Sequence, residues 1–134
     1  MPWAAQGAPK EILEQAIQLL EQAIQIHREI DNRFGEAVVL GELGKAYFRL
    51  QENEKAIDYH EQSLSYFRKK GLLRIAVKQA WQLGLVLANT EPERAVALMT
   101  ERVEFERKAG LSDVEKLAEL VAVIQARLEN GVDQ

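Results

Sequence analysis

The stretch EKAIDYHEQSLSYFR, residues 54–68, repeats an earlier stretch, EQAIQLLEQAIQIHR, residues 14–28. At this offset of 40 residues, six of the fifteen aligned positions are identical, whereas chance gives about one. Further along the chain, the same offset places Leu43 and Gly44 on Leu83 and Gly84. The chain therefore contains an internal repeat with a period near 40 residues.

Apolar residues within the repeat recur at the spacing of an amphipathic helix. Leu40, Leu43, Gly44 and Tyr47 fall at positions i, i+3, i+4 and i+7 of one segment. The pattern predicts six helices, at about residues 9–31, 36–50, 53–70, 72–89, 91–109 and 112–130. Because the turns between these helices are short, neighbouring helices are expected to run antiparallel as helical hairpins.

Glycines have two different positions in this pattern. Gly44 and Gly84 stand in the middle of predicted helices, where glycine costs about 1 kcal/mol relative to alanine. We therefore expect a neighbouring helix to approach closely at both sites. Other glycines follow predicted helices, where a left-handed residue commonly ends a helix: Gly71, Gly110 and Gly131. Thr90 and Glu93 have the spacing of a capping box.

Eight residues of one repeat unit resemble the signature of a known repeat family, the tetratricopeptide repeat. They are Leu40, Leu43, Gly44, Tyr47, Ala56, His60, Ser63 and Leu64. The period near 40 residues resembles the long-repeat subclass of kinesin light chains, Leu-Gly-Asn-type adaptors and many bacterial signalling proteins. The resemblance implies an all-α fold, a right-handed superhelix of stacked helical hairpins, and a role as a protein-binding scaffold or adaptor.

The register of the repeat predicts a single domain over residues 9–130. Helix 9–31 aligns with second helices of the repeat and helix 112–130 with first helices. The expected order is a half repeat at 9–31, full repeats at 36–70 and 72–109, and a half repeat or cap at 112–130. Residues 1–8 and 131–134 are expected to be tails.

Composition limits the function classes. The 134 residues carry 17 basic and 21 acidic side chains, a net charge of −4, which argues against general binding to nucleic acid. The absence of cysteine excludes disulfides, thiolate metal sites and thiol catalysis. No apolar stretch is long enough to span a membrane and no secretory signal is recognisable, so a cytoplasmic location is expected.

Residues suited to catalysis or metal binding do not cluster in the sequence. His27 and His60 lie on helix faces that also carry core residues, and neither has a second ligand at i+3 or i+4 that would complete a metal site. No phosphate-binding loop and no nucleophile motif is present. We therefore expect no cofactor, no metal and no enzymatic activity.

First helices line a concave groove in the stack that the resemblance implies. The groove residues predicted on this basis are Val38, Lys45, Phe48, Arg49, Lys78, Trp81, Gln82, Leu85 and Asn89. Trp81 aligns with Gly41. Two interpretations of Trp81 remain open: an exposed anchor for a partner, or a side chain packed between hairpins.

Cations cluster in one part of the chain. Between Glu61 and Glu91 there is no acidic residue, but five basic ones: Arg68, Lys69, Lys70, Arg74 and Lys78. Such a patch favours an acidic protein or peptide partner. The alternative is a solvated corner beside a helix C-terminus. RNA binding ranks last, because few aromatic side chains accompany the charges.

The last predicted helix is apolar around most of its circumference, unlike an ordinary end cap. An alternative function is therefore a homo-oligomerisation or scaffold element, such as a homodimer, that associates through its apolar terminal helices. The predicted contacts are Leu117, Leu120, Val121, Ile124 and Leu128. Helix 9–31 carries Ile12, Leu19 and Ile26 off its main stripe. Because Leu19 aligns with Tyr59 and Ile26 with Tyr66, both are predicted to be ordinary packing positions.

Overall fold

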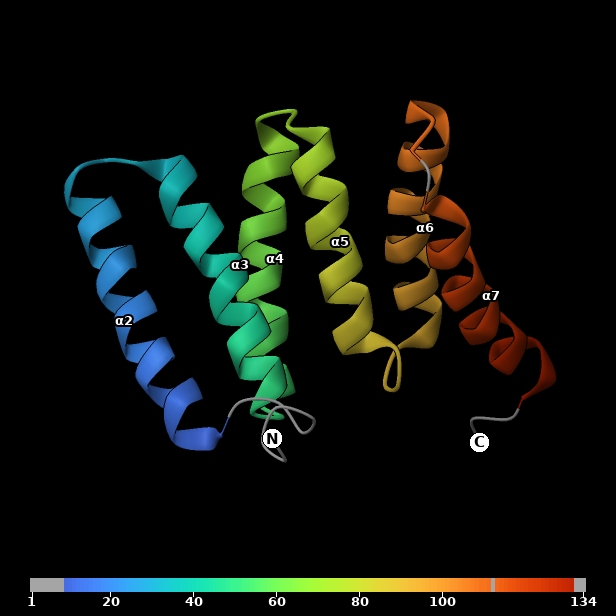
Figure 1. Cartoon of the computed structure of the whole chain (residues 1–134), viewed down its shortest axis with the longest axis horizontal. Helices are drawn as coiled ribbons and strands as arrows, with labels where there is room; N and C mark the ends of the chain where they lie inside the picture. The colour runs from blue at the N-terminus through green and yellow to red at the C-terminus, as the bar shows by residue number, and fades with distance from the viewer. Residues whose placement is uncertain (1–8, 112, 132–134) are drawn as a thin grey trace. The chain divides into compact units, whose positions relative to one another are not determined.

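A computed structural model describes residues 9–111 and 113–131. Within these ranges the chain forms six helices and no strand (Figure 1): α2 (Lys10–Glu29), α3 (Arg33–Arg49), α4 (Asn53–Lys69), α5 (Leu73–Leu87), α6 (Pro92–Ala109) and α7 (Val114–Asn130). The predicted all-α fold with six helices is confirmed for this part of the chain. None of these helices is long and apolar enough to cross a membrane.

The chain divides into two compact units, Met1–Tyr66 and Phe67–Gln134. In the first unit α2 packs against α3, and α3 contacts α4 through a hydrogen bond from Ser63 Oγ to the carbonyl oxygen of Ala37. In the second unit α6 packs against both α5 and α7. Each unit is thus built from antiparallel neighbouring helices.

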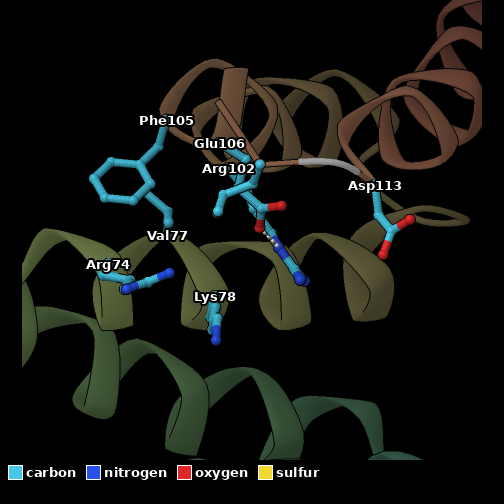
Figure 2. Close-up of a pocket in the computed structure, with 8 residues that line it drawn as sticks. Arg74, Val77, Lys78, Arg102, Phe105, Glu106 and Asp113 are labelled. Carbon is cyan, nitrogen blue, oxygen red and sulfur yellow. Dashed lines mark hydrogen bonds and ion pairs between the residues drawn. The ribbon is translucent and has the colours of Figure 1, made fainter. Parts of the chain in front are cut away.

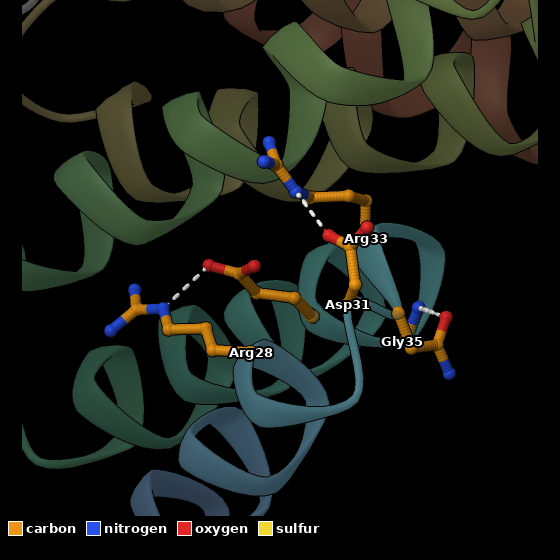
Figure 3. Close-up of polar contacts among 6 residues, drawn as sticks. Arg28, Asp31, Arg33 and Gly35 are labelled. Atoms are coloured by element: carbon orange, nitrogen blue, oxygen red, sulfur yellow. Dashed lines mark hydrogen bonds and ion pairs between the residues drawn. The ribbon is translucent and has the colours of Figure 1, made fainter.

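The turn between α2 and α3 fixes where α3 begins. The Asn32 side chain accepts a hydrogen bond from the backbone N–H of Gly35 at 2.9 Å, which caps the helix. Arg28 on α2 donates to Glu36 on α3 at 2.8 Å (Figure 3). Because Asn32 supplies this cap, α3 begins at Arg33, three residues before the predicted start at residue 36.

Helix ends agree with the glycine pattern but not with the predicted capping box. Left-handed backbone is found at all three predicted glycines, with φ of 70° at Gly71, 71° at Gly110 and 65° at Gly131. The prediction for Thr90 is wrong, because the cap of α6 is Glu91 and its side chain makes no capping hydrogen bond. Pro92 occupies the first helical position, where its fixed φ starts the helix one residue later.

Close helix packing at the mid-helix glycines is confirmed. A Cβ atom on Gly44 would lie 2.6 Å from Nε2 of His60, which is buried. A Cβ atom on Gly84 would collide with Cγ of Met99 and lie 3.1 Å from the carbonyl oxygen of Ala95. The cost of glycine in these helices is therefore offset by the contact of α3 with α4 and of α5 with α6.

Tyr47 in the first unit gives the fold a dependence on alkaline pH. Its ring is buried and stacks on Tyr59, with centroids 5.5 Å apart. Burial, and next the carboxylate of Glu21, raise the pKa of Tyr47 above its ordinary value of 10.0. As the pH rises, the Tyr47 phenol therefore ionises at a lower pH in the unfolded chain than in the folded one. The contribution of Tyr47 to stability is complete below pH 10 and falls as the pH rises beyond it.

We expect the Tyr47→Phe variant to lose stability less steeply above pH 10 than the wild type, because it has no phenol to ionise. Urea unfolding at a series of pH values measures this slope. Tyr59→Phe is the comparison variant, since Tyr59 is half-buried on the same helix pair. Equal slopes for Tyr47→Phe and the wild type would contradict the assignment.

Candidate functional site

A cavity of about 250 Å³ lies in the second unit, where α5 and α6 meet the turn that leads into α7 (Figure 2). Its lining residues come from all three elements: Arg74, Val77, Lys78, Arg102, Phe105, Glu106, Leu111 and Asp113. Three cationic and two acidic side chains line it, together with an apolar wall. The cavity therefore combines the two features that a binding site for an amphipathic ligand needs.

Two side chains of α6 that line this cavity form an ion pair. Arg102 Nε donates to Glu106 Oε2 at 2.6 Å, one helical turn away, and Glu106 is buried although it is charged. The Arg102 guanidinium also lies over the ring of Trp81, 5.4 Å from its centroid. Arg102 is therefore held in place from two sides, and its charge is largely balanced by Glu106.

The α5 side of the cavity is more strongly basic. Arg74 and Lys78 lie one turn apart on α5, and both are exposed. Neither forms an ion pair with any carboxylate among the described residues. Figure 2 shows Asp113 at the opposite end of the cavity from Arg74. Two cations at this edge thus remain available to an acidic ligand.

Apolar side chains complete the wall. Val77 comes from α5, Phe105 from α6 and Leu111 from the turn before α7. Val77 is buried, whereas Phe105 and Leu111 are half-buried and keep part of their surface accessible. An apolar side chain of a ligand can contact this wall while a neighbouring carboxylate meets Arg74 or Lys78.

The predicted groove residues fall into both units. On α3 of the first unit, Val38, Phe48 and Arg49 are exposed, and Lys45 is half-buried with its Nζ 3.5 Å from Glu42. On α5 and the turn after it, Lys78 and Asn89 are exposed, while Gln82 and Leu85 are half-buried. The sequence prediction that these residues form one groove stays a prediction.

Trp81 is not an exposed anchor. Its side chain is only 6% exposed, so the interpretation of Trp81 as a surface hot spot is wrong and the side chain is packed inside the protein. The physical reason is its place on α5 beside buried Ala80 and Val77, with Arg102 of α6 lying over the ring. Trp81 instead contacts Arg102, which lines the cavity.

One of the five cations in the predicted basic patch is paired with a carboxylate. Arg68 donates two hydrogen bonds from Nη2 to the carboxylate of Glu101, at 2.7 and 2.9 Å, so its charge is paired with α6. Sequence reasoning counted only nearby acidic residues, and Glu101 lies 33 positions away. Lys69 and Lys70 are exposed at the end of α4, together with Arg74 and Lys78 on α5.

The apolar end helices differ from expectation in opposite directions. On α7, Leu120 is 40% exposed and Leu117, Val121 and Leu128 are half-buried, but Ile124 is buried and cannot serve an interface. On α2, Leu19 and Ile26 are 66% and 57% exposed, so the prediction that they are packing positions is wrong. Their counterparts Tyr59 and Tyr66 on α4 are half-buried.

Both histidines contact residues of the first unit. His27 contacts the Asn32 side chain, with Nδ1 and Nδ2 3.2 Å apart, and His60 is buried against Gly44. Over residues 9–111 and 113–131, no three His, Asp or Glu side chains are grouped as metal ligands would be.

Several cavity residues were not predicted from the sequence: Val77, Arg102, Phe105, Glu106, Leu111 and Asp113. A signal existed for one pair, because Arg102 and Glu106 have the i, i+4 spacing of a helical ion pair. The cavity itself had no signal, since it depends on how α5, α6 and the following turn meet.

Comparison with known proteins agrees with the repeat. Residues 13–69 match the family model of the tetratricopeptide repeat. This match supports a tetratricopeptide-repeat family for the segment that contains α3 and its flanking helices, and the helical architecture of the described residues is consistent with that fold. No curated protein matches the sequence at a significant level. Repeats of this family are non-enzymatic scaffolds that mediate protein–protein interaction.

Proposed function

We propose that this protein binds an acidic segment of a protein partner, with the cavity beside Arg74 and Lys78 as its contact site. The ligand that fits is a peptide in which a carboxylate side chain neighbours an apolar one. The carboxylate pairs with the two cations of α5, and the apolar side chain lies against Phe105 and Leu111. The observation that carries this proposal is the cavity with two unpaired cations at one edge.

Charge and preorganisation support the proposal. The chain is acidic overall, with a net charge of −4, so a local cluster of unpaired cations stands out against its own surface. Arg102 is held by Glu106 and by Trp81, so it loses little conformational entropy when a ligand binds. A cavity whose central side chains are already ordered favours specific binding over non-specific attraction.

Exposed residues of α3 support the same chemistry in the first unit. Val38 and Phe48 supply apolar surface, and Arg49 supplies a cation, all on one helix. This mixture suits an acidic peptide with apolar side chains, as the cavity does. We propose these residues as a second contact surface for the partner.

Replacing both Arg74 and Lys78 with glutamine is expected to weaken binding of an acidic peptide by about tenfold or more. The probe is a fluorescein-labelled peptide of alternating glutamate and leucine, and fluorescence anisotropy measures its dissociation constant. The loss is expected because glutamine leaves a polar side chain at each position but removes both positive charges. Wild-type affinity should also fall as salt is added, since exposed charges are screened.

Two controls make the result specific. Lys116→Gln removes an exposed cation on α7, outside the cavity, and should leave the dissociation constant unchanged. A second peptide with glutamine in place of glutamate should bind weakly to the wild type. If Lys116→Gln weakens binding as much as the α5 variant does, attraction is non-specific and the proposed site is wrong.

The non-enzymatic role follows the general character of the repeat family. The cytoplasmic location stays a prediction from the sequence. Homo-oligomerisation through α7 has less support than the sequence alone gives it, because Ile124 is buried.

A further inference from the structure

Helix α2 carries a continuous stripe of exposed apolar side chains in the first unit. Ile12, Leu19, Ile26 and Ile30 are 53%, 66%, 57% and 64% exposed, which is unusual for four large aliphatic residues on one helix. Half-buried Ala16 and Ala23 lie between them. We call the six residues the α2 stripe: Ile12, Ala16, Leu19, Ala23, Ile26 and Ile30.

The α2 stripe has the spacing of a helix-packing seam. Successive members are separated by four, three, four, three and four residues, which is the alternation of core positions in a coiled coil. Positions with this spacing stay on one side of a helix over its whole length. Leu13, Ile17 and Ile24 lie on a different side and are buried. Helix α2 therefore has two apolar faces: one is buried, and the large residues of the other are exposed.

The repeat indicates what such a face does when a helix covers it. At the offset of 40 residues, Ala16, Leu19 and Ala23 correspond to Ala56, Tyr59 and Ser63 of α4. In α4 this face meets α3: the Ser63 hydroxyl bonds to the α3 backbone, and Tyr59 stacks on Tyr47 of α3. The small residues at these positions let another helix approach closely. The α2 stripe is thus shaped to pack against a helix.

We propose that the α2 stripe is the interface of a homodimer, in which the α2 helices of two copies pack antiparallel about a two-fold axis midway between Leu19 and Ala23. The stripe is complementary to itself in this orientation only. Leu19 then faces Ala23 of the second copy, Ala16 faces Ile26 of the second copy, and the two outer isoleucines, Ile12 and Ile30, face each other. In the central part of the seam large residues oppose small ones, so the seam fills there.

A parallel arrangement lacks this fit. It pairs Ala16 with Ala16 and Ala23 with Ala23, leaving gaps, and it pairs Leu19 with Leu19, which holds the helices apart. Gaps forfeit packing energy, and a seam that alternates between gaps and bulk fits poorly. The order of large and small residues along α2 therefore selects the antiparallel dimer.

Charges beside the stripe permit two copies to meet. Its solvent-facing flank consists largely of uncharged amides, and all four are exposed: Gln15, Gln18, Gln22 and Gln25. Glu11 and Glu29 on the same flank lie near the ends of α2, away from the axis. The centre of the interface thus brings neutral groups together and avoids like-charge repulsion, and the glutamines can hydrogen-bond across it.

The stripe on α2 is also a better candidate than the apolar end at α7. Only Leu120 and Val123 are strongly exposed among the large apolar residues of α7, at 40% and 51%. This inference goes beyond the proposed peptide binding, because the cavity lies in the second unit and the α2 stripe in the first.

Light scattering and sedimentation over a concentration series test the dimer. The wild-type chain should have twice the monomer mass of 15.2 kDa and dissociate on dilution. Leu19→Glu and, separately, Ile26→Glu should raise the dissociation constant of the dimer at least about tenfold, because each buries a charge at the seam. Both positions are exposed in the monomer, so circular dichroism should show unchanged helix content.

The matched control is Leu120→Glu, the same substitution at the most comparable exposed leucine of α7. It should leave the dimer intact. A wild-type mass of 15.2 kDa at every concentration overturns the proposal, and so does dissociation by Leu120→Glu with no effect of Leu19→Glu.

Spin labels test the orientation, since the chain has no native cysteine. In the antiparallel dimer the Gln15 residues of the two copies are about 18 Å apart along the helix direction. The two Gln22 residues lie close together, because Gln22 is near the two-fold axis. Labels on Gln15→Cys should therefore give a longer distance between copies than labels on Gln22→Cys. Equal distances would mean a parallel pair and overturn the proposed arrangement.

Discussion

Replacing Trp81 with alanine is expected to lower the free energy of unfolding by about 3–5 kcal/mol, the usual cost of removing a buried aromatic side chain. Trp81 is 6% exposed and its ring carries the guanidinium of Arg102. The substitution removes apolar contacts, leaves a cavity beside α6 and frees Arg102 from one of its two supports. Urea unfolding followed by circular dichroism measures the change, with the slope against urea used to check that the transition stays cooperative.

The conservative variant Trp81→Phe separates packing from partner recognition. Phenylalanine refills most of the space, so this variant should recover much of the lost stability. It should also keep binding of the glutamate–leucine peptide, because Arg74 and Lys78 are untouched. If Trp81→Ala instead unfolds like the wild type and only loses peptide binding, the packing role of Trp81 is wrong.

Sequence reasoning predicted the fold well because the information is local and repeated. The 40-residue period, the helical spacing of Leu40, Leu43 and Tyr47, and the terminal glycines together determine where helices run and end. Close packing at Gly44 and Gly84 was also predictable, since a glycine in mid-helix is costly unless something offsets it. Errors at helix starts were small and came from Asn32 and Pro92, whose capping roles act over one turn.

The candidate site was predicted only in part, because it depends on which helices meet. The alignment of Trp81 with Gly41 suggested an exposed position, but alignment carries no information about Arg102 on the next helix. In the same way, Arg68 was counted as a free cation because Glu101 is distant in sequence. Lys78 was predicted as a ligand-facing cation and does border the cavity.

The wrong prediction for the α2 stripe has a different cause from the errors at the cavity. Hydrophobic periodicity is the same whether or not a neighbouring helix covers a face, so Leu19 and Ile26 were taken for packing positions by analogy with Tyr59 and Tyr66. Only the three-dimensional arrangement distinguishes the face of α4 that meets α3 from the equivalent face of α2. An apolar repeat position at the edge of a helical stack therefore predicts either packing or association, and burial decides between them.

Introducing valine at Gly84 is expected to destabilise the protein by about 3 kcal/mol, although valine forms helix slightly better than glycine. A Cβ atom there collides with Cγ of Met99, and it lies 3.1 Å from the carbonyl oxygen of Ala95, which is backbone and cannot move aside alone. α5 and α6 must separate, and the buried contacts between them weaken. Thermal and urea unfolding of the variant measure the loss.

A double-mutant cycle with Met99→Ala identifies the cause of that loss. Met99→Ala alone removes a fully buried side chain and should cost about 2–5 kcal/mol. In the double variant, valine at position 84 fills part of the space that Met99 vacates, so the combined cost should be smaller than the sum by at least about 1 kcal/mol. Strict additivity would mean that the contact of Met99 with Gly84 is not what limits the approach of α5 and α6. A coupling of the expected sign would show that glycine is required at position 84 by the neighbouring helix and not by the backbone conformation of α5.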